Sequence, residues 1–220
     1  MIFVNFKTYD QGSGENALKL ITILEAASEA FSIAVIPVVQ AGDVKEARAN
    51  SKLEIWTQHI DPVEFGAHTG FILPEAVFED GAKGTFLNHS EHKFAEFSSL
   101  EAAVRRAKEV GLKTLIFAGG IDELEKVSAL SPDFLAYEPP ELVGSTTTSV
   151  SSAHPDIIAK AYEIAKRHDL PLIVGAGVHS RKDVEKSIEL GAVGVAVATD
   201  IVKAQNPKAE LEDLLAGFKK

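Results

Sequence analysis

The chain has 220 residues, of which 45% are hydrophobic and 25% are charged. This profile is typical of a folded globular protein and excludes a disordered, collagen-like or coiled-coil chain. Cysteine is absent, which excludes a disulfide framework, a thiolate nucleophile and a cysteine-based zinc or iron–sulfur site. The 22 basic and 32 acidic residues give a net charge of −10, so we expect no nucleic-acid partner.

The sequence also bears on where the protein resides. No apolar segment reaches the roughly 18–20 residues that a membrane-spanning helix needs. The N-terminus starts directly with a strand-like run and shows no basic leader followed by a small-residue cleavage site. We therefore expect a soluble protein of the cytoplasm that has no membrane partner.

Short apolar runs alternate with amphipathic stretches along the chain. Eight runs predict strands over residues 2–6, 33–39, 53–56, 85–87, 114–118, 134–137, 172–174 and 193–197. A helical pattern follows each run, over residues 17–31, 43–50, 74–80, 98–110, 121–130, 155–165, 180–190 and 207–218. Start signals for these helices include a Ser98-x-x-Glu101 capping box, Ser180-x-x-Asp183 and Asn206-Pro207.

Strict alternation of strands and helices predicts a parallel α/β fold. Most of the runs are continuously apolar, as strands buried on both faces are. Eight such units favour a (β/α)8 TIM barrel that forms a single domain over residues 1–220, because closure of the sheet removes both edge strands. An open doubly wound sheet is the alternative, since the chain is short for a barrel, which typically has ~250 residues.

The active site of such a barrel lies at the carboxyl ends of its strands. Polar residues of catalytic types follow the predicted strands at Asn5 and Lys7, Gln58 and His59, Asn88, His89, Ser90 and Glu91, Glu138, and Thr199. Loops are polar in any protein, which explains some of these residues. One acid, one imidazole and one lysine together with small-residue turns favour a catalytic site.

Lys7 and His89 each have a functional and a structural interpretation. Lys7 shares a strand face with Phe3 and Asn5, so it points into a dry interior and needs an anion, either Glu91 or a substrate. His89 lies beside a possible helix N-terminus, which would keep its ring neutral and able to donate to a carbonyl. A structural histidine is the alternative. The spacing His89-x-x-His92 also fits a metal pair, but without cysteine or a spaced carboxylate we expect no metal site.

Glu138 is followed by Pro139-Pro140 and by a small, polar stretch over residues 143–152. This pattern is typical of a lid, which would expel water and raise the basicity of the carboxylate. A solvated loop is the alternative. The turns Gly175-Ala176-Gly177 and Ala198-Thr199 follow the seventh and eighth runs, where barrels commonly bind phosphate through backbone N–H groups.

Together these motifs resemble the triosephosphate isomerase family in its shortened archaeal form, over nearly the whole chain. The resemblance rests on Asn5-Phe6-Lys7, Gly66-Ala67-His68-Thr69-Gly70, Leu87-Asn88-His89-Ser90-Glu91, the run from Glu138 to Gly144, Val174-Gly175-Ala176-Gly177 and Val197-Ala198-Thr199. Of these, the Asn-His-Ser-Glu segment is highly specific.

The resemblance implies that the chain interconverts dihydroxyacetone phosphate and D-glyceraldehyde 3-phosphate in glycolysis and gluconeogenesis, without cofactor or metal. Glu138 would move a proton between two carbons, and neutral His89 would polarise the carbonyl oxygens. Lys7, with Asn5 beside it, would offset the enediolate and phosphate charge, and Glu91 would orient Lys7. The resemblance further implies that the phosphate is bound by N–H groups of Val143 or Gly144, Gly177, Ala198 and Thr199. It also implies a homodimer or homotetramer.

The sequence departs from the family pattern at two places. The predicted lid tip reads Gly144-Ser145-Thr146 where archaeal members have Gly-Thr-Gly. Asp200 stands where the family has a small residue, and we expect its side chain to point away from the phosphate. Two alternatives stay open at this point: another phosphosugar barrel, such as an epimerase or a synthase, and a non-catalytic barrel that binds phosphorylated ligands or a partner protein.

Overall fold

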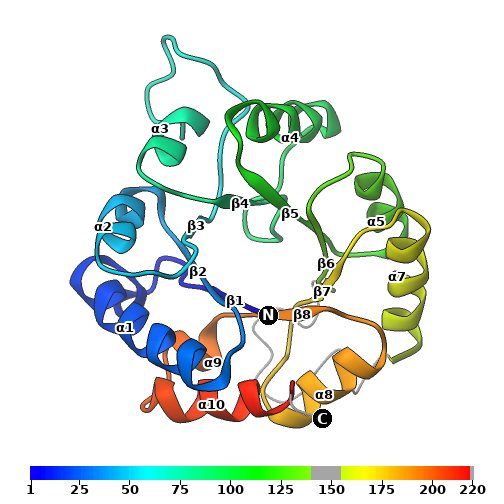
Figure 1. Cartoon of the computed structure of the whole chain (residues 1–220). Helices are drawn as coiled ribbons and strands as arrows, with labels where there is room; N and C mark the ends of the chain where they lie inside the picture. Colours follow the sequence, from blue (N-terminus) through cyan, green and yellow to red (C-terminus); the bar gives the residue numbers. More distant parts are fainter. Residues whose placement is uncertain (140–154, 219–220) are drawn as a thin grey trace.

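A closed barrel of eight parallel strands forms the centre of the protein (Figure 1). The computed structural model describes residues 1–139 and 155–218. The strands are β1 (Ile2–Asn5), β2 (Val35–Val39), β3 (Trp56–Thr57), β4 (Gly84–Leu87), β5 (Lys113–Ala118), β6 (Phe134–Tyr137), β7 (Leu172–Val174) and β8 (Gly194–Val197). Phe3 of β1 pairs with Ile36 on one side and with Ala196 of β8 on the other, which closes the sheet. The predicted barrel is therefore confirmed, and the open sheet is wrong.

Helices surround the barrel on its outside (Figure 1). They are α1 (Gly14–Phe31), α2 (Val44–Ala49), α3 (Pro74–Glu79), α4 (Phe97–Val110), α5 (Ile121–Ser128), α7 (Pro155–Arg167), α8 (Arg181–Glu189), α9 (Thr199–Val202) and α10 (Pro207–Ala216), with short 3-10 turns at Asp10–Gly12 and Ala41–Asp43. Within the described residues, no helix is both long enough and apolar enough to cross a membrane.

The strands bury side chains on both faces, which explains their continuously apolar sequence. One cluster fills the barrel interior, and its large members are Phe3, Trp56, Phe86, Leu115 and Phe117. The ring of Phe3 packs edge-on against Trp56, with ring centroids 5.0 Å apart. A second, larger cluster lies between the outside of the barrel and the helices. Because the interior is packed with side chains, polar chemistry is confined to the rim at the strand ends.

Several predicted boundaries differ from the structure by one to three residues, and two local predictions, the third strand and the capping box of α4, are wrong. The third strand covers Trp56–Thr57 instead of residues 53–56, and the carboxylate of Glu54 instead accepts hydrogen bonds from Trp56 Nε1 and Lys113 Nζ. The Ser98-x-x-Glu101 capping box does not form, because α4 begins at Phe97 and its N-cap is Glu96, two residues before Ser98. The position of Glu54 depends on Lys113, which is distant in sequence, so the local pattern does not reveal where the third strand begins.

The other two start signals lie at helix starts. Ser180 is the N-cap of α8, although its hydroxyl donates to the Asp183 carboxylate at 2.8 Å instead of accepting from the helix. Asn206 is the N-cap of α10, and its side-chain oxygen accepts from the N–H of Ala209 at 3.2 Å. Both helices therefore start where the sequence predicts.

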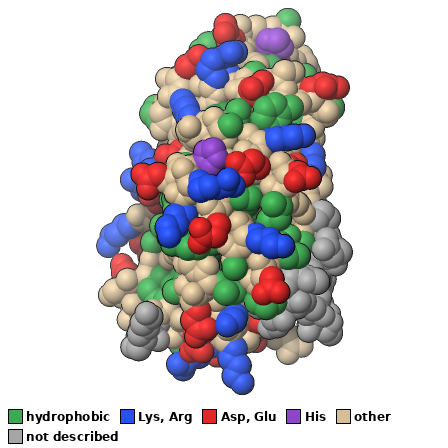
Figure 2. All heavy atoms as spheres, turned by 90° about the vertical axis from the view of Figure 1, so that its right-hand side faces the viewer, with side chains coloured by type: hydrophobic (Ala, Val, Ile, Leu, Met, Phe, Trp, Pro, Cys, Tyr) green, Lys and Arg blue, Asp and Glu red, His purple; other side chains and the backbone are tan. Residues whose placement is uncertain are grey.

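The face that carries α5 and α7 presents acidic and basic side chains in alternation (Figure 2). One pair on it is Arg167 with Glu125, at 2.6 Å. The described part of this face therefore carries charges of both signs side by side instead of a broad field of one sign.

The loop between β3 and α3 projects beyond the ring of helices (Figure 1). The buried guanidinium of Arg106 holds the start of this loop through the carbonyl of Val63, at 3.1 Å, and also binds Glu75 and Glu109. Two side chains on the loop are largely in solvent, with Phe65 73% exposed and Phe71 54% exposed. The loop is thus an anchored projection that exposes two aromatic side chains.

Candidate active site

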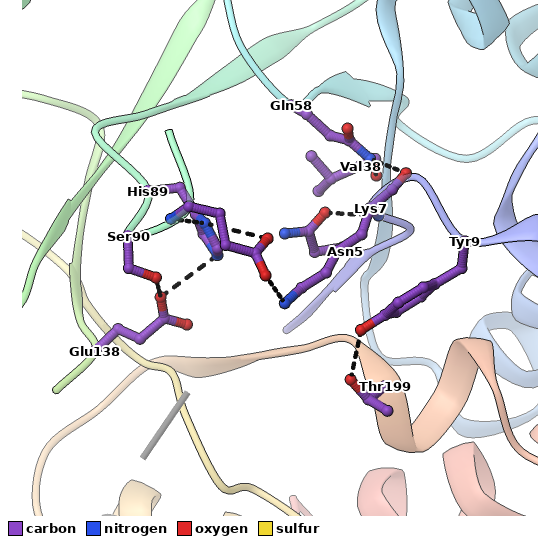
Figure 3. A network of polar contacts seen from close by, with 10 residues as sticks. Asn5, Lys7, Tyr9, Val38, Gln58, His89, Ser90, Glu138 and Thr199 are labelled. Atoms are coloured by element: carbon purple, nitrogen blue, oxygen red, sulfur yellow. Dashed lines mark hydrogen bonds and ion pairs between the residues drawn. The ribbon is translucent and has the colours of Figure 1, made fainter. Parts of the chain in front are cut away.

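The predicted catalytic side chains converge at the carboxyl ends of β1, β4 and β6 (Figure 3). They line one cavity at the rim of the barrel, which we call the rim cavity. Its wall includes Asn5, Lys7, Phe86, His89, Phe117, Glu138, residues 176–178 and residues 196–200. Residues from six strand ends thus meet around one small space, as the barrel topology dictates.

Lys7 follows β1 in an unusual backbone conformation. Its φ is 48°, in the left-handed region that non-glycine residues rarely adopt. The turn is held by Asn5, whose Oδ1 accepts the Lys7 N–H at 3.0 Å, and by Gln58, whose Nε2 donates to the Lys7 carbonyl at 2.8 Å. The ammonium group binds Glu91 Oε1 at 2.7 Å. These contacts place a nearly buried cation in the rim cavity.

His89 is held as a neutral ring with its proton on the cavity side. The N–H of Glu91 donates to Nδ1 at 3.2 Å, so Nδ1 carries the lone pair and Nε2 carries the hydrogen. The pKa of His89 is lowered to about 4, chiefly by burial; the charge of Glu91 opposes this shift and the charge of Lys7 adds to it. The expected helix N-terminus is not the cause, because α4 begins only at Phe97.

Glu138 follows β6 with only 8% of its surface exposed. Burial raises its pKa to about 7, against the opposing effects of the Lys7 charge and of the Ser90 hydroxyl, which donates to Oε2 at 3.2 Å. Oε2 also lies 3.4 Å from Nε2 of His89. Near neutral pH the carboxylate is therefore a base of the strength that suits proton abstraction.

The two predicted phosphate turns border the same cavity. Ala176 and Gly177 have φ values of 66° and 64°, so consecutive residues adopt the left-handed conformation after β7. The N–H groups of Gly177, Ala198 and Thr199 donate no hydrogen bond within the described residues. Successive free N–H groups of this kind form concave anion sites.

The remaining predicted site residues lie at the edge of the rim cavity, away from it, or outside the described residues. Glu91 contacts Lys7 but is 54% exposed on its side chain and lies outside the rim cavity. Val143 and Gly144 lie outside the described residues. No group of three or more histidine, cysteine or acidic side chains is arranged for a metal within residues 1–139 and 155–218. His92 stacks on His59, with ring centroids 4.2 Å apart.

The sequence alone does not predict a role for several site residues. Gln58 and Ser90 follow predicted strands as polar residues, but no motif around them indicates what they do. Tyr9 was not noted, and its hydroxyl bonds Thr199 Oγ1 at 3.0 Å (Figure 3). Gly175 gives the Glu138 carboxylate its space, because a Cβ there would lie 3.0 Å from Oε1. The position of Gln58 directly after a strand was a usable signal, whereas the Tyr9 and Gly175 contacts depend on barrel closure.

The geometry agrees with what similarity searches find. The family described as triosephosphate isomerase matches residues 1–216 of the chain. The chain belongs to the triosephosphate isomerase family. It is an isomerase, and the family places it in glycolysis.

Curated relatives named triosephosphate isomerase come from archaea. The protein of Methanothermus fervidus is 37% identical over 98% of this chain and 97% of its own length. The protein of Saccharolobus solfataricus is 38% identical over 98% of this chain and 94% of its own. The crystal structure of triosephosphate isomerase from Bartonella henselae matches with a TM-score of 0.75 and 19% identity, over 98% of this chain and 96% of that one. At 19% identity, the similarity to the Bartonella henselae structure shows the fold alone.

Proposed function

We propose that this chain interconverts dihydroxyacetone phosphate and D-glyceraldehyde 3-phosphate through an enediolate. The observation that carries the proposal is one pair, the buried carboxylate of Glu138 facing the neutral ring of His89 at 3.4 Å. An acid with a pKa of about 7 and a neutral imidazole donor are the two groups that enolisation of a phosphorylated hydroxyketone requires.

Glu138 is the proposed base. Its carboxylate removes a proton from the C1 carbon of dihydroxyacetone phosphate, and the electron pair of that C–H bond becomes the carbon–carbon double bond of the enediolate. The carbonyl bond opens at the same time and leaves negative charge on O2. Glu138 then returns the proton to C2, which gives glyceraldehyde 3-phosphate. The base ends as it began, so it is ready for another turnover.

His89 and Lys7 are the proposed electrophiles. The Nε2–H of His89 hydrogen-bonds to the oxygen on which charge develops, and the ring carries the hydroxyl proton from O1 to O2. The Lys7 ammonium stabilises the enediolate, and Glu91 orients it. Asn5 holds the turn that directs Lys7. Because only protons move between isomers, the mechanism needs no redox cofactor and no metal.

The phosphate group is proposed to bind the free N–H groups of Gly177, Ala198 and Thr199, with Val143 or Gly144 as further donors suggested by the family resemblance. Backbone donors bind a dianion without added positive charge, which suits a protein with a net charge of −10. Binding the phosphate positions the reacting carbons beside Glu138, and such positioning lowers the barrier by several kcal/mol, about 7–11 in well-oriented systems.

We also propose a homodimer or homotetramer that forms one domain per chain and works in the cytoplasm. The projecting loop between β3 and α3 supports association, since it exposes Phe65 and Phe71. Beside the rim cavity lies a second cavity of about 610 Å³, whose wall includes Lys7, Tyr9 and His92. We propose that the β3–α3 loop of a second copy occupies this second cavity. The partner chain would then lie close to the rim cavity.

The function is tested by turnover of glyceraldehyde 3-phosphate in the presence of a chelator. We expect strong activity in the wild type and a loss of several powers of ten in Glu138→Gln, about 10⁴-fold or more. Glu101→Gln, at an exposed position on α4, is the matched control and retains activity. Weak wild-type activity that is unchanged in Glu138→Gln would overturn the proposal and favour a non-catalytic or different phosphosugar barrel.

A further inference from the structure

A side-chain contact joins the two turns that border the rim cavity. His179 belongs to the loop after β7, and Asp200 belongs to α9 directly after β8. Nδ1 of His179 lies 2.9 Å from Oδ2 of Asp200. The side chains are 19% and 34% exposed, respectively. The contact is therefore half-buried, and it connects segments that follow neighbouring strands.

Asp200 stands at a position where a carboxylate is unfavourable. It lines the rim cavity together with Gly177 and Thr199, whose N–H groups are the proposed phosphate donors. A carboxylate that faced a phosphate dianion across this cavity would repel it, and the repulsion would be stronger than in bulk water because the cavity is partly shielded. Binding of an anion here requires that Asp200 be held aside.

His179 has the geometry to hold it. Its Nε2 is buried without a hydrogen-bond partner within the described residues, so the contact of Nδ1 with Asp200 is the ring's one polar contact there. The backbone of His179 is also held in place, because its N–H donates to Asp183 Oδ2 at 3.2 Å. Ser180 donates to the same oxygen at 2.8 Å, which fixes this loop to the first turn of α8.

We propose that His179 holds the carboxylate of Asp200 in this contact, so that it does not turn toward a bound phosphate, and that His179 is thereby a positioning residue for the phosphate group of the substrate. This inference rests on the proposed function, since it assigns the anion to that site. It explains how the chain carries an acidic residue beside its phosphate turns, and it makes the effect of His179 depend on Asp200.

The test compares single and double variants. His179→Ala releases the carboxylate, and we expect KM for glyceraldehyde 3-phosphate and Ki for inorganic phosphate to rise about tenfold, with a much smaller change in kcat. His179→Ala combined with Asp200→Asn removes the released charge, so most of the lost affinity returns. A merely structural role predicts the opposite order, because the double variant would then be at least as impaired as the single one.

Two further variants serve as controls for this comparison. His168→Ala, at the residue directly after α7, removes a histidine that also pairs with a carboxylate, and it is expected to leave KM unchanged. In the wild type, His168 Nε2 lies 3.4 Å from Glu125 Oε1. His179→Asn keeps a donor toward Asp200 and retains most of the phosphate affinity, so it serves if His179→Ala fails to fold. Unchanged KM and Ki in His179→Ala, or no recovery in the double variant, would overturn the inference.

Calorimetry with inorganic phosphate separates this inference from the proposed function. Phosphate affinity is measured without turnover, so the order of wild type, His179→Ala and the double variant can be read even from an inactive protein. A wild type that binds phosphate but does not isomerise the triose phosphates contradicts the proposed function alone. A wild type that binds no phosphate contradicts the assignment of His179.

Discussion

Nε2 of His89 and Oε2 of Glu138 face each other at 3.4 Å, and burial favours the uncharged form of both groups. The pKa of His89 is lowered to about 4 and that of Glu138 is raised to about 7. Above neutral pH the pair therefore consists of a neutral donor and an ionised base. This is the arrangement that proton abstraction next to a carbonyl needs, with the donor aimed where charge develops.

The pH dependence of the rate follows from Glu138. We expect kcat/KM to fall as the pH drops below about 7, because protonation removes the base. The Ser90 hydroxyl stabilises the ionised form, so Ser90→Ala raises the pKa of Glu138 and moves the acid limb to higher pH. Profiles of the two proteins between about pH 5 and 9 check this. The substrate phosphate titrates equally in both, so superimposable acid limbs would contradict the assignment.

Gly175 is predicted to be required for the position of Glu138. A Cβ at residue 175 would lie 3.0 Å from Oε1, so Gly175→Ala pushes the carboxylate out of place. A displacement of this kind costs up to about 10²-fold in kcat, with the fold retained. Gly120→Ala is the control, since nothing lies within 4 Å of a Cβ built there. Steady-state kinetics with a melting curve for each variant check the prediction, and full kcat in Gly175→Ala would refute it.

Stability should respond to pH in opposite directions through His89 and Glu138. His89 binds fewer protons in the folded state than in the unfolded state. Its contribution to the free energy of unfolding is therefore present above about pH 6.5 and is lost as the pH falls toward 4. Glu138 binds more protons when folded, so its contribution grows as the pH falls from about 7 toward its unfolded value near 4.5. Between those limits the two effects largely cancel in the wild type.

Removing either group exposes the effect of the other. Relative to wild type, Glu138→Gln should lose about 2–3 kcal/mol of unfolding free energy as the pH falls from about 6.5 to 4.5, and His89→Gln should gain a similar amount. Urea unfolding at several pH values measures this, and all other titrating groups are common to the three proteins. Parallel stability curves for all three would contradict the shifted pKa values.

The barrel was predictable because its strands are short and buried on both faces, which continuously apolar runs encode directly. That the candidate catalytic residues lie close together was predictable for a related reason, since the carboxyl ends of the strands meet at one rim. The third strand was not, because Glu54 is held by Trp56 and by Lys113 of a distant strand. The cause of the low His89 pKa was missed as well, because burial depends on packing that only the closed barrel provides.

Likewise, the contact between His179 and Asp200 joins residues that are 21 positions apart, with α8 and β8 between them. No local pattern indicates it. From the sequence, the Asp200 side chain is expected to point away from the phosphate, and a phosphate-bound structure tests this. The local sequence shows only that an acidic residue, Asp200, stands next to a predicted phosphate turn.

The projecting loop gives a test of association. Phe65 and Phe71 are the large apolar side chains on it, and replacing both by glutamate puts two charges where we propose that a second copy packs. We expect the molar mass from light scattering to fall toward that of one chain. Phe78→Glu is the control, because Phe78 is 42% exposed on α3 and lies outside the loop. An unchanged mass in the double variant would show that this loop does not hold the copies together.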